Sequence, residues 1–101
     1  MKIIIKESKI EMLMSEYLDS WVKDMAVTKS SPFIVISRKV TPYEDEWDDT
    51  MEHDFTDGRL WVDKNFKLFL SDLFGKSQSD IMVFLAKWFE KRYNVDVEFV
   101  E

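Results

Sequence analysis

The sequence predicts an α+β fold, in which a mixed or mostly antiparallel sheet of four to five strands packs against three helices. Apolar residues spaced three and four apart predict the helices, whereas short β-branched or alternating runs predict the strands. The elements follow in the order strand, helix, strand, hairpin, helix, helix, strand, which has too few repeated units for a doubly wound sheet. A length of 101 residues and a hydrophobic content of 46% favour one domain, residues 1–101, with its own core.

The chain is expected to open with a strand and a long helix. Three Ile residues in a row within Lys2–Lys6 are typical of a strand covered on both faces. Ser8 and Glu11 have the spacing of a capping box, and apolar residues recur at helical steps from Lys9 to about Val27. A Ser-Ser-Pro break then precedes a second strand, Phe33–Val40, whose composition is rich in β-branched residues.

Turn and capping residues divide the second half of the chain. Asp57-Gly58, followed by the strand-like run Arg59–Val62, predicts a two-residue hairpin turn. A helix is predicted over Asn65–Phe74, because its apolar residues have helical spacing and a Gly follows it. A capping-box pair opens the next helix, Ser77 to about Tyr93. The alternation of Val and Phe with acidic residues after position 94 predicts a final strand.

Most of the charge imbalance lies in one segment, Thr41–Asp57. It contains eight Asp and Glu residues and no Lys or Arg, whereas the whole chain has a formal net charge of −6. The remainder is therefore close to neutral, and the acidity is a local field that suits a cationic partner. Because it lies between a Pro-terminated strand and an Asp-Gly hairpin, we interpret residues 41–57 as an acidic insertion loop.

The acidic segment also carries aromatic residues that can anchor it in a pocket of a partner while the carboxylates meet a basic rim. An ordinary solvated loop, with Trp47 folded back onto the domain, is the alternative. The predicted partner-binding residues are Tyr43, Glu44, Asp45, Glu46, Trp47, Asp48, Asp49, Glu52 and Asp54.

No pattern in the sequence predicts a catalytic site, a metal centre or a cofactor. The Gly75-Lys76-Ser77 triplet lacks the earlier Gly of a phosphate-binding loop and suits a helix end followed by a cap. A single His53 is more typical of a solvated loop or strand residue than of a metal ligand, and the ligand pattern of a calcium-binding EF-hand fails around Gly58. Weak, nonspecific cation binding by Glu44–Asp54 stays open. We expect a protein that is not an enzyme.

The run Ile81–Ala86 is apolar around most of a helix and must be covered on more than one side. Burial between the sheet and the other helices is one interpretation, and a subunit interface is the other. The candidate interface residues are Ile81, Met82, Phe84 and Leu85. The same run makes a poor DNA-recognition helix, because its start is not basic, and the basic residues of its last turns suit the helix dipole; direct nucleic-acid binding is therefore disfavoured.

The opening KIIIKESKI, residues Lys2–Ile10, resembles the start of small uncharacterised proteins encoded by tailed phages, in which a basic-flanked apolar strand meets a K-E-S step and a helix. The resemblance covers these residues alone and carries over no functional residue. It implies a small accessory protein, either a virion component or an early protein that acts on a host factor.

Three functions are consistent with these features. The first is a non-catalytic protein-binding or accessory module whose acidic aromatic loop contacts a protein with a basic surface. The second is an acidic inhibitor that imitates nucleic-acid phosphates, and the third is a small structural component of a larger, virion-like assembly. The absence of Cys and of a long apolar run favours a cytoplasmic protein without a membrane segment, in the host cytoplasm or the virion if a phage encodes it.

Overall fold

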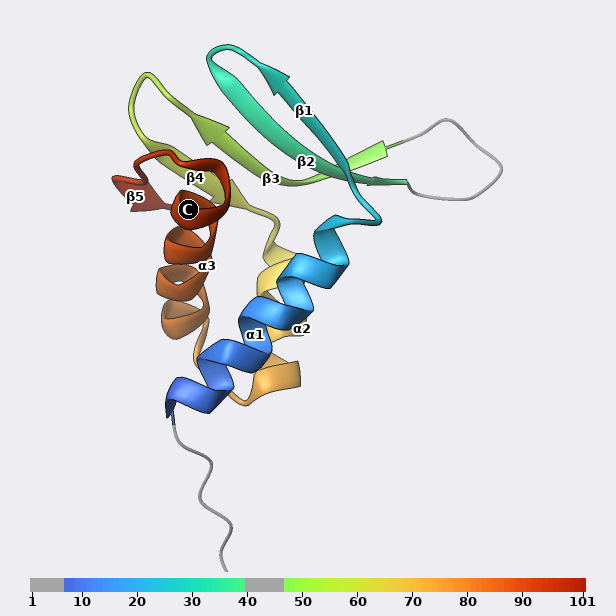
Figure 1. Cartoon of the computed structure of the whole chain (residues 1–101), viewed down its shortest axis with the longest axis vertical. Coiled ribbons are helices and arrows are strands. Elements are labelled where there is room, and N and C mark those ends of the chain that lie inside the picture. Colours follow the sequence, from blue (N-terminus) through green and yellow to red (C-terminus); the bar gives the residue numbers. More distant parts are fainter. Residues whose placement is uncertain (1–6, 40–46) are drawn as a thin grey trace, which may run out of the picture.

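Three helices and a five-stranded sheet make up residues 7–39 and 47–101, which are the residues that the computed structural model describes (Figure 1). The α+β class is confirmed. In chain order the elements are α1 (Glu7–Val22), β1 (Ala26–Ser30), β2 (Phe33–Lys39), β3 (Trp47–Asp54), β4 (Arg59–Val62), α2 (Lys64–Phe74), α3 (Gln78–Tyr93) and β5 (Phe99–Val100).

The strands lie side by side in chain order, β1-β2-β3-β4-β5. The first four form an antiparallel meander, and β5 pairs parallel with β4. A parallel neighbour requires a crossover connection, which α2 and α3 provide here. The sheet is therefore mixed and mostly antiparallel, as the sequence predicts.

The first helix is shorter than predicted, and an unpredicted strand follows it. α1 ends at Val22, and β1 pairs with β2 so that Val27 faces Ile36 and Thr28 faces Val35. β-branched residues pack well on a pleated sheet, which explains why this segment leaves the helix although the helical spacing continues to Met25. The strand expected at Lys2–Lys6 lies outside the described residues.

The acidic segment is not a loop throughout, because β3 occupies Trp47–Asp54 near the middle of the sheet. Met51 and His53 are buried, whereas Glu52 and Asp54 are half-buried, so the side chains alternate between the core and the opposite face. The register shifts between β2 and β3 at Ile36 in a β-bulge. The insertion-loop interpretation is therefore wrong for this part of residues 41–57, and residues 40–46 are outside the described ranges.

The β3–β4 hairpin is confirmed, but its turn has four residues, Phe55 to Gly58, and not two, because Asp54 pairs with Arg59. Gly58 has φ 73°, a left-handed conformation that suits Gly. Its carbonyl accepts a hydrogen bond from the Glu98 amide at 2.8 Å, which ties the hairpin turn to the C-terminal segment.

The predicted end of α2 at Gly75 and the predicted cap of α3 at Ser77 are confirmed. Gly75 ends α2 in the left-handed conformation, with φ 63°. The Ser77 hydroxyl accepts a hydrogen bond from the Asp80 amide at 3.2 Å at the start of α3, and Asn94 ends that helix with φ 54°. The final strand is confirmed only at Phe99–Val100, and the alternation before it is not strand.

The core lies between one face of the sheet and the three helices. The sheet layer and the helical layer are separate in Figure 1, with all three helices on the same side of the strands. Ile81 and Leu85 are 0% exposed and belong to this core, whereas Met82 and Phe84 are half-buried. The core residues are Met14, Leu18, Val22, Ile34, Ile36, Met51, Leu60, Val62, Leu70, Ile81, Leu85, Trp88 and Phe89.

Candidate functional site

The sheet face that points away from the helices carries most of the described acidic residues of β3. On β2 and β4, buried core residues alternate with half-buried ones that point to this opposite face. No described helix or strand covers it (Figure 1). We name it the acidic sheet face, and register and alternation assign to it Phe33, Val35, Asp49, Glu52, Asp54, Arg59, Trp61, Phe99 and Glu101.

A row of three side chains crosses the middle of the acidic sheet face. Val35 of β2 lies opposite Glu52 of β3, which in turn lies opposite Trp61 of β4. Side chains at such paired positions are direct neighbours, with Cβ atoms about 5 Å apart. The row therefore places a carboxylate between an aliphatic and an aromatic side chain on a surface held by backbone hydrogen bonds.

A shallow hollow of about 210 Å³ lies beside this row, lined by Asp49, Glu52, Arg59, Trp61 and Glu101. Arg59 lies 3.9 Å from the Glu101 carboxylate, and both side chains keep a third or more of their surface exposed. Exposed ion pairs of this kind contribute little stability. Acidic groups outnumber the basic one here, so the hollow is negatively charged.

Two carboxylates at the margins of the acidic sheet face have local partners. Asp49 accepts a hydrogen bond from the Ser37 hydroxyl at 2.8 Å. Asp54 accepts hydrogen bonds from the Thr56 hydroxyl at 2.6 Å and the Thr56 amide at 2.9 Å. The Thr56 side chain, and then its amide, lower the pKa of Asp54 from its ordinary value of 3.8. Among the described residues no group engages the Glu52 carboxylate, which is therefore available to a partner.

The structure brings together only part of the predicted partner-binding set. Asp49, Glu52 and Asp54 lie on the acidic sheet face, whereas Asp48 forms an exposed ion pair with Arg38 at 3.6 Å. Trp47 begins β3 in register with Lys39, and residues 43–46 lie outside the described ranges.

Sequence reasoning missed the residues that other strands contribute to this face, above all Val35, Trp61 and Glu101. The alternation within Arg59–Val62 was a usable pattern, since it places Arg59 and Trp61 on one face and Leu60 and Val62 on the other. The pairing of β3 with β2 and β4, which brings these residues together, is a long-range property that no local pattern encodes.

His53 is buried and not solvated, which corrects the prediction. Only 1% of its surface is exposed, and its Nε2 lies 2.9 Å from the Asp96 carbonyl oxygen. The imidazole lies between two aromatic rings, with centroids 5.0 Å from Phe55 and 5.4 Å from Phe89. Within residues 7–39 and 47–101, no group of three His, Cys, Asp or Glu side chains is arranged to hold a metal ion.

The predicted basic patch on the last turns of α3 borders a second hollow, of about 720 Å³, between α1 and α3. Asp19 of α1 accepts hydrogen bonds there from the Trp88 indole at 3.0 Å and the Arg92 guanidinium at 3.3 Å. The Asp19 carboxylate thus joins the two helices and balances part of the basic charge.

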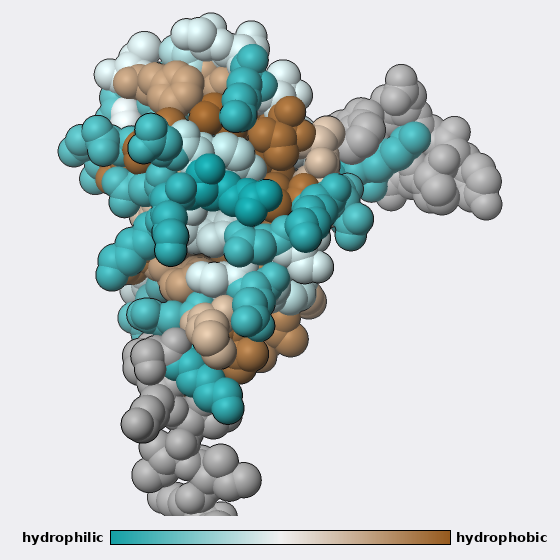
Figure 2. All heavy atoms as spheres, in the orientation of Figure 1, coloured by the Kyte–Doolittle hydropathy of each residue, from teal (hydrophilic) through white to brown (hydrophobic). Residues whose placement is uncertain are grey.

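Exposed apolar side chains gather on α1 and α2. Leu13, Phe69 and Leu73 are 42%, 52% and 50% exposed, and Tyr17 packs against Phe69 with ring centroids 6.3 Å apart. Figure 2 shows hydrophobic residues near the lower end of the helical layer within a mostly hydrophilic surface. We name Leu13, Tyr17, Phe69 and Leu73 the helical apolar patch. None of the described helices has the length and apolar character needed to cross a membrane.

Comparison with known proteins adds no relative: no family model, curated protein or solved structure matches the chain.

Proposed function

We propose that the protein is a non-catalytic protein-binding module whose acidic sheet face contacts a basic surface on a partner protein. The observation that carries this proposal is the row across the sheet, in which the Glu52 carboxylate, unpaired among the described residues, lies between Val35 and Trp61. Trp is among the residue types enriched at energetically important contacts, and a carboxylate beside it adds charge complementarity to a basic partner.

The charge of this face favours a cationic partner. Its four carboxylates, Asp49, Glu52, Asp54 and Glu101, face a single guanidinium, that of Arg59. A cluster of like charge raises the rate at which an oppositely charged protein associates, and salt screens this effect over about 10 Å at 0.1 M. Trp61 and Val35 supply the apolar contact that holds the complex once it has formed.

The experiment compares two variants that lose the same charge from opposite layers. Glu52→Gln with Asp49→Asn neutralises the acidic sheet face, and Glu16→Gln with Asp72→Asn neutralises exposed positions on α1 and α2. Partners are captured from an extract of the organism that encodes the protein, and the dissociation constant of each is measured by titration.

We expect the sheet-face variant to bind about 10-fold or more weakly at roughly 50 mM salt, which corresponds to about 1.4 kcal/mol. The helix variant should bind within about twofold of wild type. The difference should shrink at roughly 0.5 M salt, where charges are screened over a few Å. Equal losses in the two variants, or a salt-independent difference, would contradict the proposal.

A second candidate, the phosphate-mimicking inhibitor, is favoured by the spacing on β3. Glu52 and Asp54 are two residues apart on one strand face, and such side chains are roughly 7 Å apart on a rigid sheet. Under this alternative the captured partner binds nucleic acid, and DNA or RNA competes with the acidic sheet face for it. A partner that binds nucleic acid and this protein at the same time excludes the alternative.

A third candidate, the assembly component, is favoured by the helical apolar patch. Monomeric proteins seldom expose large contiguous apolar surface without a binding role. The molar mass in solution, compared between wild type and Phe69→Ser with Leu73→Ser, tests it. A monomeric wild type at high protein concentration excludes self-assembly through this patch.

A further inference from the structure

The acceptor nitrogen of His53 has no hydrogen-bond partner in the part of the chain that the structure describes. The Asp96 carbonyl can only accept a hydrogen bond, so Nε2 donates to it at 2.9 Å, and in the neutral ring Nδ1 carries the lone pair. Nδ1 is buried and has no hydrogen-bond partner among the described residues. Because buried polar atoms in native proteins are nearly always hydrogen-bonded, an unpaired one requires an explanation.

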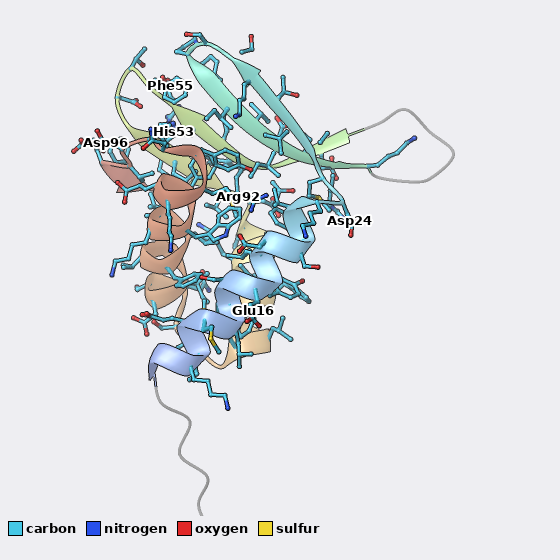
Figure 3. All side chains as sticks on the ribbon, in the orientation of Figure 1. Glu16, Asp24, His53, Phe55, Arg92 and Asp96 are labelled. Carbon is cyan, nitrogen blue, oxygen red and sulfur yellow. The ribbon has the colours of Figure 1, made fainter. Side chains whose placement is uncertain are left out.

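A pocket of about 850 Å³ adjoins this imidazole, between the sheet and the end of α3. Phe55 and Tyr93 give it aromatic walls, and Asp57, Asp96 and Glu98 give it three carboxylates against one amine, that of Lys29. Figure 3 shows His53, Phe55 and Asp96 close together beside the β3–β4 turn. The pocket is therefore aromatic and negatively charged, and His53, whose buried Nδ1 acceptor is unpaired among the described residues, is one of the residues that line it.

Lys29 shows that the pocket can hold a cation. Its ammonium nitrogen lies 5.7 Å from the centroid of the Tyr93 ring, within the range of a cation–π interaction. Tyr93 is an uncharged phenol at neutral pH even at its ordinary pKa of 10.0, and burial raises this pKa further.

We propose that this pocket takes an arginine side chain of the partner protein, whose guanidinium donates a hydrogen bond to His53 Nδ1 and lies against Phe55 and Tyr93. Guanidinium is planar, offers five N–H donors and stacks on aromatic rings, which meets each property of the pocket. Nδ1 is itself buried, so the guanidinium reaches it when the Phe55 ring, which packs against the imidazole and is 46% exposed, turns aside.

The pocket and the acidic sheet face meet at the β3–β4 turn, because Asp54 lies on that face and the turn residues Phe55 to Gly58 line the pocket. This inference rests on the proposed function, since it names one contact that the same basic partner makes. A partner seated on the sheet face thus reaches the pocket around the β3–β4 turn.

The test uses N-acetyl-arginine amide as the probe and the full chain as the target. His53 is the only histidine in the sequence, so its two ring nitrogen signals are assigned without ambiguity in a ¹⁵N-labelled sample. We expect the probe to shift the Nδ1 signal and leave the Nε2 signal nearly unchanged, with a dissociation constant in the millimolar range typical of a single side chain. The matched citrulline amide, which has the same shape without charge, should bind at least about fivefold more weakly.

A variant that binds the arginine probe more tightly distinguishes the proposed contact from a loss of folding, which can only weaken binding. Lys29→Met removes the ammonium that competes for the Tyr93 ring, so the arginine probe should bind about threefold or more tightly. Glu98→Gln with Asp57→Asn should weaken binding by a similar factor. Absence of an Nδ1 shift in both wild type and Lys29→Met, or equal binding of the citrulline probe, would overturn the proposal.

The proposed arginine contact in the pocket and the proposed function of the acidic sheet face can be contradicted independently. If the captured partner loses affinity with the Glu52 and Asp49 variant but not with Glu98→Gln and Asp57→Asn, the arginine contact is excluded and the binding function stands. If the arginine probe shifts Nδ1 but the sheet-face variant keeps full affinity for the partner, the pocket stands and the proposed function of the face fails.

Discussion

Two glycines with the same backbone conformation but different surroundings provide a direct test of how the C-terminal segment is held. Gly58 and Gly75 have φ of +73° and +63°. A Cβ on Gly75 meets nothing within 4 Å, whereas one on Gly58 lies 2.4 Å from Cγ, 3.0 Å from Cβ and 3.2 Å from the amide nitrogen of Glu98. Substitution by Ala thus has the same conformational cost at both positions and a steric cost at Gly58 alone.

The expected losses in the free energy of unfolding follow from this conformational cost and this steric cost. A left-handed conformation costs an ordinary residue roughly 1–2 kcal/mol, which is the expected loss for Gly75→Ala. Overpacking adds about 1–3 kcal/mol, so Gly58→Ala should lose about 2–5 kcal/mol. The Glu98 side chain can swing away, but its amide donates to the Gly58 carbonyl at 2.8 Å and cannot move without losing that hydrogen bond.

Urea unfolding followed by tryptophan fluorescence measures both losses, since the chain has four Trp residues. With a slope of roughly 1–3 kcal/mol per molar urea, the midpoint of Gly58→Ala should lie clearly below that of Gly75→Ala. Glu98→Ala removes the nearest atom, Cγ, so combining it with Gly58→Ala should recover part of the difference. Equal destabilisation of the two glycine variants would refute the argument that the turn and the C-terminal segment are in tight contact.

Three other perturbations test the core, a helix cap and the charged turn. Phe89→Ala, at a fully buried position, should lower the free energy of unfolding by about 3–5 kcal/mol in the same urea assay, and a loss below about 1 kcal/mol would contradict its place in the core. Ser77→Ala removes the cap of α3 and should lose about 1 kcal/mol, whereas Ser77→Asp should keep most of the stability. The pKa of Asp54 is lower in the folded protein than its ordinary 3.8, so its contribution to stability is present above about pH 3.8 and is lost as the pH falls below that value. Thermal melts from pH 6 to 2 should show a smaller loss of stability in Thr56→Val than in wild type. Identical pH profiles for the two proteins would contradict a stabilising role of the Asp54–Thr56 hydrogen bonds.

The parts of the fold that the sequence predicted well are those set by local chemistry. The end of α2 and the start of α3 follow from Gly75, which adopts the left-handed conformation, and from Ser77, whose hydroxyl caps the next helix. Both effects act within one helical turn, so the residue types and their spacing are sufficient to locate them. The same holds for the turn before Arg59, where Gly58 supplies the positive φ.

The errors lie where a distant partner decides the conformation. Val27 and Thr28 follow a helical apolar stripe, yet they form β1 because β2 offers Ile36 and Val35 as cross-strand neighbours. The acidic residues of β3 have low strand propensity and resemble a loop by composition. Pairing with strands on both sides overrides that propensity, since it fixes Met51 and His53 in the core.

In the candidate site, too, local features were predictable from the sequence and features set by distant residues were not. The concentration of carboxylates is evident in the sequence, but Trp61 and Glu101 join it only through the pairing of β4 with β3 and of the C-terminal segment with β4. The buried environment of His53 was also not predictable from the sequence, because the hydrogen-bond partner of its Nε2, Asp96, and its ring neighbour Phe89 lie far along the chain. Composition indicated the charge of the site, and topology determined its members.

The location of the acidic residues on a strand changes the conformational entropy that this protein would lose on binding. A loop that becomes ordered on binding loses conformational entropy, which is subtracted from the affinity that its contacts provide. Asp49 and Glu52 instead belong to β3, whose backbone is already fixed by β2 on one side, and for Glu52 by β4 on the other. Their geometry is therefore set in the free protein. Under the proposed function, a basic protein that fits the spacing of these carboxylates would be favoured over one that is merely positively charged.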